Sequence, residues 1–400
     1  MTEPTPPLQR VKAARSPLRL GVAGVGGYGD TVLRAVETFG PTLETPIETA
    51  AVYEALPDRA GERLASLKSS GVAVYGEYGE MVNDPSLDAV WLPVPIHLHL
   101  PMTLEALRAG KAVMCEKPAA GSTAELDAMI AGRDASGLPL LIGFQEVYSP
   151  LTRALKQRLL DGVIGEVKRV SVRACWPRDS SYFGRNNWAG RREVVGRPVH
   201  DSPLSNALAH FVNLSLLFAG VDGLDQSAAP IKPRVSLYRV NPIENFDTVT
   251  LACATEAGPE VLVWMTHACE SGVEPVIRID GSTGRVTRTL QEVRIEVPGR
   301  PDEVIPVDGR NVQPMYEAFA GVLSGHGGGA SILATPELVR PHTSLVEQLA
   351  ACPIHTVPAD RIVEAERADG SVLRSLPGIE ERFARAQNDG EAPLDLLVGA

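Results

Sequence analysis

The residue best placed for chemistry in this sequence is Lys117, which follows almost directly on a short apolar run, AVMC, at residues 112–115. Such a run is typical of a buried strand, which gives the residues after it a rigid support. Pro118 cannot continue the hydrogen-bond ladder of the strand, and it stiffens the turn. Glu116 is then placed to hydrogen-bond and orient the ammonium group, so we expect Lys117 to face the ligand cleft at the carboxyl ends of the strands. The alternative is a surface lysine at the start of a loop.

A second candidate is His210, which lies in the apolar stretch SNALAHFVNLSLLF, for which a helix is predicted. Asn206, His210 and Asn213 stand at positions i, i+4 and i+7 of that helix and therefore share one face. Buried polar groups need hydrogen-bond partners, and a polyhydroxylated ligand would provide them. The alternative is a set of core residues that hydrogen-bond to one another or to the backbone.

A glycine pattern near the start of the chain predicts a dinucleotide site. In GVAGVGGYGD, Gly24, Gly26 and Gly29 form G-x-G-x-x-G between a predicted strand and a predicted helix. The first glycine permits a tight turn, the second lets a pyrophosphate approach, and the third lets helix and strand pack closely. Gly27 and Tyr28 complete the candidate loop, whose phosphates would face the helix N-terminus. The alternative is a glycine-rich turn without a ligand.

Glu54 ends the second predicted strand, and it lies 54 − 29 = 25 residues after the last glycine of this pattern. A carboxylate about 20 residues past the loop accepts hydrogen bonds from ribose hydroxyls and repels a 2′-phosphate. The expected cofactor is therefore NAD. NADP stays open because Arg59 is near enough in sequence to reach a phosphate. A solvated glutamate at a strand end is the alternative for Glu54.

A long polar loop precedes the predicted helix of His210. Its aromatic rings suit the C–H face of a sugar, and its Arg and Asn side chains suit sugar hydroxyls. These candidate ligand-binding residues are Trp176, Arg178, Tyr182, Arg185, Asn187 and Trp188. The alternative is a loop packed by its own aromatic residues or buried at a subunit interface.

Two domains are expected to position these residues. Over residues 17–145, short apolar runs alternate with helical stretches, which predicts an α/β Rossmann domain with a parallel sheet. Residues 146–335 carry runs of period two, which predicts an α+β domain with a largely antiparallel sheet. Residues 1–16 are predicted to be a flexible tail, and residues 336–400 to return to helix and end in a polar tail.

The composition excludes several classes of function. The formal net charge is −11, so the surface repels phosphate backbones and nucleic acid is not an expected partner. No apolar run reaches the length of about 18 residues that a membrane-spanning helix needs. The five cysteines are scattered and form no CxxC pair, which argues against disulfides and a thiolate zinc site and favours a reducing cytoplasm. His97 and His99 are two apart and cannot share a helix face, so no metal site is predicted.

Several of these motifs together resemble the Gfo/Idh/MocA oxidoreductase family. They are GVAGVGGYG, AVWLPVPIHLHLPMTLEALRAGKAVMCEKPAA and GFQEVYSP with DGVIGEVKRV, and the resemblance is densest over residues 18–176. It implies a Rossmann domain plus an α+β domain with an open-faced sheet. It also implies NAD(P)-dependent oxidation or reduction of a sugar or polyol hydroxyl. Because an open sheet face needs a cover, a homo-oligomer formed through that sheet is expected.

The resemblance also implies roles for single residues. The lysine that matches Lys117 hydrogen-bonds the reacting hydroxyl and the nicotinamide side of the cofactor. The residues implied to lie beside the cofactor are Val94, Pro95, His97, Glu116, Lys117 and Gln145. The sequence departs from the family pattern before His97, where Ala-Thr-Pro-Asn is replaced by PVPI, so two polar contacts are lost. Gln145 is expected to end the sixth strand, and an ordinary strand-end amide is its alternative.

The family pattern D-x-G-x-H aligns with His210, but Asn206 stands where the aspartate would be. We therefore expect His210 to act as the general base, Lys117 to stabilise the developing alkoxide, and Asn206 to orient a hydroxyl. Two alternatives remain open. One is a redox-neutral glycoside hydrolase, lyase or epimerase with tightly bound NAD. The other is a non-catalytic NAD-binding sensor.

Overall fold

The computed structural model describes residues 16–307, 311–329 and 331–397, which form two compact units. The first comprises Met1–Ala120, Ala124–Pro150 and Asn311–Glu337, and the second comprises Gly121–Thr123, Leu151–Arg310 and Leu338–Ala400. The predicted tail lies outside the described residues except for Ser16, as does the side chain of Arg59.

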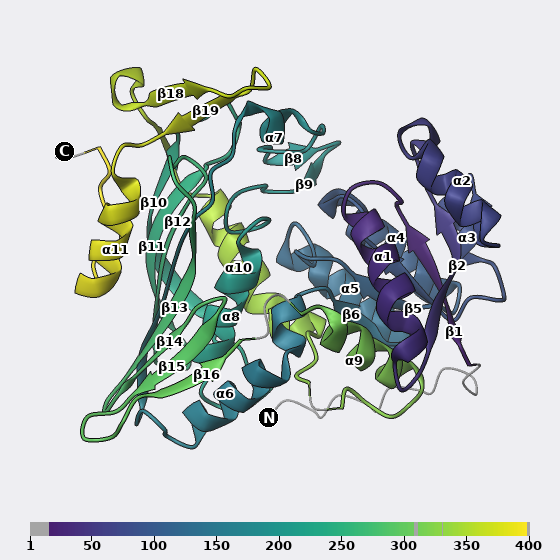
Figure 1. Cartoon of the computed structure of the whole chain (residues 1–400), viewed down its shortest axis with the longest axis horizontal. Helices are drawn as coiled ribbons and strands as arrows, with labels where there is room; N and C mark the ends of the chain where they lie inside the picture. Colours follow the sequence, from purple (N-terminus) through teal and green to yellow (C-terminus); the bar gives the residue numbers. More distant parts are fainter. Residues whose placement is uncertain (1–15, 308–310, 330, 398–400) are drawn as a thin grey trace. The chain divides into compact units, whose positions relative to one another are not determined.

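In the described part of the first unit, six parallel strands form one sheet in the order β3-β2-β1-β4-β5-β6 (Figure 1). The predicted Rossmann fold is confirmed. The strands are β1 (Leu18–Ala23), β2 (Ile47–Tyr53), β3 (Ala73–Tyr75), β4 (Ala89–Leu92), β5 (Ala112–Cys115) and β6 (Leu140–Ile142). Every residue of β4 and β5 is buried, which explains their continuous apolar runs. The strand order reverses between β1 and β4, where sheets of this kind bind ligands.

Helices connect these strands. They are α1 (Tyr28–Phe39), α2 (Gly61–Ser69), α3 (Tyr78–Val82), α4 (Ile96–Arg108) and α5 (Thr123–Ser136), with the 3₁₀ turns η1 (Gly40–Thr42), η2 (Pro57–Arg59) and η3 (Gln145–Tyr148). A further helix, α9 (Gln313–Leu323), belongs to this unit. Its Tyr316 stacks on Trp91 of β4 at 4.4 Å between ring centroids, and its Phe319 packs edge-on at 5.7 Å. The sequence analysis placed this segment in the second domain, and that assignment is wrong. The helix belongs to the first unit because it packs on an aromatic residue that is distant in sequence, and no local pattern indicates such a contact.

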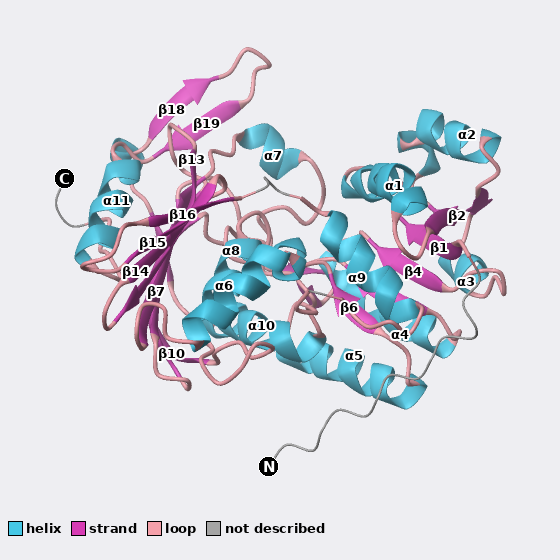
Figure 2. Ribbon diagram, turned by 60° about the horizontal axis from the view of Figure 1, so that its bottom comes forward, coloured by secondary structure: helices cyan, strands magenta, loops and turns pink. Residues whose placement is uncertain are grey.

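In the described part of the second unit, nine strands form a mostly antiparallel sheet in the order β16-β15-β14-β13-β7-β12-β11-β10-β17 (Figure 2). The predicted α+β architecture is confirmed. The strands are β7 (Val167–Cys175), β10 (Pro230–Arg239), β11 (Thr248–Thr255), β12 (Glu260–Thr266), β13 (Val273–Gly281), β14 (Arg285–Arg288), β15 (Glu292–Glu296), β16 (Glu303–Pro306) and β17 (Ile354–Thr356). The pairs β7–β12 and β10–β17 are parallel.

Helices and two short hairpins complete the second unit. They are α6 (Pro150–Leu160), α7 (Ser180–Gly184), α8 (Ala209–Ala219), α10 (Pro336–Ala350), α11 (Ile379–Asp389), β8–β9 (Glu193–Val194, Arg197–Pro198) and β18–β19 (Val363–Glu366, Val372–Ser375). Figure 1 shows α8 and α11 on opposite sides of the large sheet. The sequence analysis predicted helix and a polar tail after residue 335. That prediction is incomplete, since this segment also supplies β17 to the sheet.

The C-terminal segment covers part of the sheet face that was expected to be open. Ile379, Phe383 and Ala386 of α11 are buried against Trp264 of β12 in one apolar cluster. Leu394 and Leu396 belong to the same cluster. The chain itself therefore covers this face over β7, β12 and β11, where a second copy of the protein was expected. Self-association through an open sheet face stays a prediction for the remaining strands.

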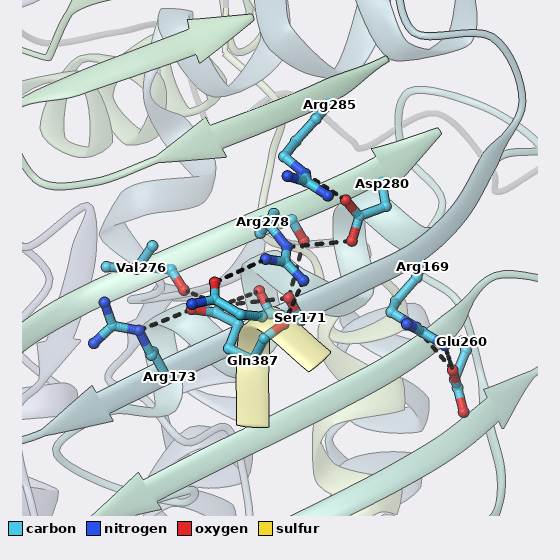
Figure 3. A network of polar contacts seen from close by, with 10 residues as sticks. Arg169, Ser171, Arg173, Glu260, Val276, Arg278, Asp280, Arg285 and Gln387 are labelled. Carbon is cyan, nitrogen blue, oxygen red and sulfur yellow. Dashed lines mark hydrogen bonds and ion pairs between the residues drawn. The ribbon is translucent and has the colours of Figure 1, made fainter. Parts of the chain in front are cut away.

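Polar contacts also attach α11 to the sheet (Figure 3). Gln387 accepts a hydrogen bond from Arg173 Nε at 2.9 Å and donates one to the carbonyl oxygen of Val276 at 3.1 Å. Arg278 of β13 donates to the carbonyl oxygen of Gln387, and Asp280 pairs with both Arg278 and Arg285. The helix is thus held by apolar packing and by directed bonds, which fixes its register on the sheet.

Candidate active site

The glycine loop has the backbone geometry that its sequence predicted. Gly24 and Gly27 have φ values of +100° and +57°, which side-chain-bearing residues rarely adopt. A Cβ at Gly29 would overlap the carbonyl oxygen of Gly24, whereas a Cβ at Gly26 would meet no atom within 4 Å. Helix α1 begins at Tyr28, and no side chain caps its N-terminus. The loop therefore leaves room and uncapped N–H groups for a phosphate, so it fits a dinucleotide.

Glu54 lies directly after β2, and its carboxylate contacts the glycine loop. It accepts hydrogen bonds from the backbone N–H groups of Val25 at 2.7 Å and Gly26 at 3.2 Å. Its other oxygen accepts from the N–H of Leu56 at 2.9 Å. The carboxylate thus ties the end of β2 to the loop while keeping a negative charge at the position predicted for the ribose.

Lys117 lies just beyond the carboxyl end of β5 and is half-buried. The neighbouring Glu116 is buried, and its carboxylate accepts a hydrogen bond from Trp91 Nε1 at 3.0 Å and from the backbone N–H of Lys117 at 3.4 Å. Burial raises the pKa of Glu116 to about 7, although these bonds and the charge of Lys117 oppose the rise. Glu116 therefore fixes the main chain that carries the lysine.

Tyrosines surround this buried carboxylate. The charge of Glu116 and burial both raise the pKa of Tyr28, and burial followed by Glu116 raises those of Tyr148 and Tyr316. The hydroxyl of Tyr28 also donates to Gln145 Oε1 at 3.5 Å. Gln145 begins the 3₁₀ turn η3 and does not end β6, which corrects the sequence prediction. The phenols stay protonated, and that of Tyr148 donates to the carbonyl oxygen of Ile142 at 2.9 Å. Sequence spacing gives no sign of this cluster.

His99, which the sequence analysis used only to argue against metal binding, links two predicted cofactor segments. It is buried in α4, and its ring nitrogens lie 2.9 Å from the carbonyl oxygens of Val94 and Pro118. Burial lowers its pKa to about 4, so the ring is neutral and donates to one of these oxygens. The PVPI segment and the turn after Lys117 are thus joined through one side chain. His97, the predicted cofactor contact, is half-buried near the start of α4.

In the second unit, α8 begins at Ala209, so Asn206 lies in the turn before the helix. The predicted three-residue face is therefore wrong, and only His210 and Asn213 are helical. Asn213 is fully buried, whereas His210 is partly exposed. The turn forms because residues 202–205 hydrogen-bond locally through two serine hydroxyls, which competes with helix.

A carboxylate lies beside Asn206 after all, although the sequence places it outside the family pattern. Asp201 is buried, and its Oδ1 accepts a hydrogen bond from Asn206 Nδ2 at 2.8 Å. Its Oδ2 accepts from the backbone N–H of Gly190 at 2.6 Å. Asp201 therefore orients the Asn206 amide and attaches the aromatic loop to the turn before α8. No spacing rule signals this contact.

The predicted ligand-binding loop forms a stack of arginines and aromatic rings. Arg185 Cζ lies 3.6 Å from the ring centroid of Tyr182 and 5.0 Å from that of Trp188. Arg178 Cζ lies 4.6 Å from the Tyr182 centroid and 5.8 Å from that of Trp176. The aromatic loop is thus packed by its own residues, and Tyr182 contacts both guanidinium groups. Asn187 is exposed.

This stack is continuous with the start of α8. Trp176 packs edge-on against Phe211 at 6.1 Å between centroids, and Phe211 lies next to His210 at 6.5 Å. His267, which the sequence analysis did not single out, lies 5.9 Å from the Tyr182 ring, and its Nδ1 bonds the carbonyl oxygen of Trp176 at 2.8 Å. Burial lowers the pKa of His267 to about 3, so it is a neutral support for the stack.

Among the described residues, no group of three or more His, Cys, Asp and Glu side chains is arranged to hold a metal ion. Likewise, none of the described helices is long and apolar enough to cross a membrane.

Residues 18–144 match the family model described as "Oxidoreductase family, NAD-binding Rossmann fold". An uncharacterised oxidoreductase of Rhizobium meliloti is 32% identical over 155 residues, 38% of this chain and 44% of that protein. The scyllo-inositol 2-dehydrogenase (NADP(+)) of Bacillus subtilis is 32% identical over 161 residues, 40% of this chain and 45% of that protein. The matches to the first relatives thus span less than half of those proteins.

Solved structures resemble the chain over most of its length. A 3-ketoreductase from Actinomadura kijaniata, in complex with NADP and TDP-benzene, has a TM-score of 0.68 and 22% identity, covering 86% of this chain and all of that one. An oxidoreductase from Thermotoga maritima has a TM-score of 0.69 and 19% identity, covering 84% of this chain and 96% of that one. At these identities the likeness establishes the fold.

Proposed function

We propose that this chain is an NAD(P)-dependent dehydrogenase or reductase of the Gfo/Idh/MocA type, acting on a hydroxyl or keto group of a sugar or polyol, because residues 18–144 match the NAD-binding Rossmann model of that family. The observation that carries the proposal is the shared edge of one sheet. The glycine loop follows β1 and Lys117 follows β5, with β4 between these strands. Relatives named as inositol dehydrogenases support the substrate class.

The cofactor would be held by the glycine loop and the segments around it. The N-terminus of α1 would take the pyrophosphate, Glu54 the ribose, and the segment joined by His99 the nicotinamide side. When bound, NAD(P) supplies hydride transfer to or from the carbon that bears the oxygen. Because Glu54 presents a negative charge that disfavours a 2′-phosphate, we propose NAD as the preferred form.

In this proposal two residues act on the substrate oxygen. His210 takes the proton from the substrate hydroxyl as a general base, since an imidazole changes protonation near neutral pH. The ammonium of Lys117 stabilises the negative charge that develops on the substrate oxygen. Asn206, held by Asp201, orients a neighbouring hydroxyl and cannot itself act as a base. In the reductive direction His210 returns the proton to the substrate oxygen, and Lys117 again stabilises the charge on that oxygen.

The first experiment is to denature the purified protein and measure released nicotinamide nucleotide by mass spectrometry. A protein that releases none is then assayed with NAD⁺ and NADP⁺ on a panel of sugars and polyols at the NADH absorbance. The variants Lys117→Met and His210→Ala are expected to lose turnover, and turnover within twofold of the wild type in both would contradict the assigned roles. Stoichiometric retained NAD would instead favour the redox-neutral hydrolase, lyase or epimerase.

The same proposal includes a cytoplasmic location and self-association. The first rests on the scattered cysteines, all of which are free in the described structure. The second rests on the strands of the large sheet that α11 leaves uncovered. Light scattering of the full-length protein measures the second, and a monomer at all concentrations would contradict it.

A further inference from the structure

The loop that precedes α8 has a charge opposite to that of the whole protein. Residues 178–197 contain five arginines and two carboxylates, whereas the chain as a whole has a formal net charge of −11. A local excess of positive charge in an acidic protein concentrates anions at that place. This loop also carries the residues predicted to contact the substrate, so its charge bears on what the substrate is.

Two of these arginines have no carboxylate partner in the described structure, namely Arg178 and Arg185. Arg191 of the same loop, in contrast, pairs with Glu244 at 2.9 Å. In the sheet of the same unit, Arg169 pairs with Glu260 at 2.9 Å. Arg178 and Arg185 thus differ from these two ion-paired arginines of the same unit.

Nearby carboxylates are present but serve other donors. Asp179 accepts hydrogen bonds from the backbone N–H groups of Ser181 and Tyr182 at the start of α7. Asp201 accepts from Gly190 and Asn206, as described above. The positive charges of Arg178 and Arg185 are thus not compensated by the acidic residues of their own loop.

Aromatic rings, and no carboxylate of the described residues, position these two guanidinium groups. A guanidinium packed on a ring contacts it through its face, so the N–H groups at its edge keep their directions for an anion. One N–H of Arg185 donates to the carbonyl oxygen of Tyr182, and Nε of Arg178 is buried without a hydrogen-bond partner. The remaining N–H groups of these two arginines suit a carboxylate or a phosphate, which bind guanidinium groups through paired bonds.

The stack also packs against the helix that carries the proposed base. Trp176, which contacts Arg178, packs on Phe211, and Phe211 adjoins His210. The loop that carries the two arginines is therefore attached to the start of α8, one residue from His210. From this arrangement we propose that the substrate is a sugar or polyol derivative with an anionic group, a carboxylate or a phosphate, bound by Arg178 and Arg185. This inference rests on the proposed function, because it takes His210 as the reacting end.

Equilibrium binding by calorimetry with saturating NADH tests the inference separately from turnover. The probes are D-glucuronate, D-glucose 6-phosphate and their neutral parent D-glucose, each at 50 mM and 500 mM NaCl. At least one anionic probe is expected to bind at least 10-fold more tightly than glucose. High salt is expected to weaken the binding of the anionic probes only. Which of the two binds decides between carboxylate and phosphate. Equal affinity for all three probes would overturn the inference.

The variants Arg185→Gln and Arg178→Gln assign the binding to the stack. Each is expected to raise the dissociation constant of the anionic probe by about 10-fold to 100-fold, because a charge-assisted hydrogen bond is lost. The dissociation constant of glucose is expected to change less than twofold. Arg191→Gln is the matched control from the same loop and is expected to leave both affinities unchanged. Arg185 is exposed, so its variant stays informative even where Arg178→Gln fails to fold.

The two proposals fail in different ways. Arginine-dependent binding of an anionic probe without oxidation or reduction of any panel compound would contradict the proposed function and support this inference. Turnover of neutral sugars with a kcat/KM equal to that of the anionic analogues, unchanged in Arg185→Gln, would overturn this inference and support the proposed function.

Discussion

The two units hold their candidate chemistry in different ways. In the first, backbone groups define the site: the turn of the glycine loop, the N–H groups that meet Glu54, and the strand end that carries Lys117. In the second, side chains define it: Asp201 holds Asn206, and aromatic rings hold two arginines. A site made of backbone groups keeps its binding properties for one cofactor when side chains are exchanged. A site made of side chains changes its binding properties with single substitutions. We therefore expect cofactor binding to depend on the first unit and substrate choice on the second.

The largest expected effect is that of Lys117→Met. Loss of the ammonium removes the charge that stabilises the substrate oxygen, which typically reduces kcat by about 100-fold to 1000-fold. The dissociation constant of NADH, measured by fluorescence, is expected to change less because the glycine loop is untouched. Lys68→Met on the exposed end of α2 is the matched control and is expected to keep full activity. A normal kcat in Lys117→Met would show that Lys117 takes no part in the chemical step, and would contradict the role proposed for the first unit.

A second prediction concerns Glu116, whose burial raises its pKa to about 7 from 4.5. Between these values the folded protein holds a proton that the unfolded chain releases, so the free energy of unfolding falls as pH rises through this window, by about 3 kcal/mol in all. Glu116→Gln mimics the protonated acid, so this dependence is expected to vanish, with the variant more stable than the wild type at pH 8 and similar at pH 5. Urea unfolding at both pH values measures the difference. Parallel pH dependence in both proteins would show that Glu116 is ionised throughout.

The same contrast explains which features could be predicted from sequence. Gly24, Gly29, Glu54 and Lys117 lie next to strands whose apolar runs are visible, so their places followed from local patterns. Asp201 was not predicted, because its contact with Asn206 depends on a loop closing back on the turn before α8. The periodicity also predicted that α8 includes Asn206, because periodicity does not register the serine hydroxyls that delay the start of the helix to Ala209. Helix α9 was misassigned because its partner, Trp91, lies more than two hundred residues earlier.

A third prediction tests the side-chain site through Asp201→Asn. An amide keeps one acceptor but presents an N–H₂ group in place of the second, so one of the bonds to Asn206 and Gly190 is lost. The KM for the substrate is expected to rise about 10-fold, in line with one lost charge-assisted hydrogen bond, while the dissociation constant of NADH stays unchanged. Ser180→Ala on the neighbouring α7 serves as the control. An equal rise in the NADH constant would mean that the two units do not divide cofactor and substrate as proposed.

The smallest expected effect tests whether the first unit also sets cofactor choice. Glu54→Gln keeps an acceptor for the N–H groups of Val25 and Gly26, loses the bond from the N–H of Leu56, and removes the negative charge beside the predicted ribose. Because the charge disfavours a 2′-phosphate, the ratio of the NADP to the NAD dissociation constant is expected to fall about fivefold to tenfold, which corresponds to about 1 kcal/mol. Titration of each reduced nucleotide, followed by its fluorescence, measures the ratio, and Glu48→Gln on the same strand is the control. An unchanged ratio with weaker binding of both nucleotides would mean that Glu54 acts only by holding the loop, and cofactor choice would then lie with other residues.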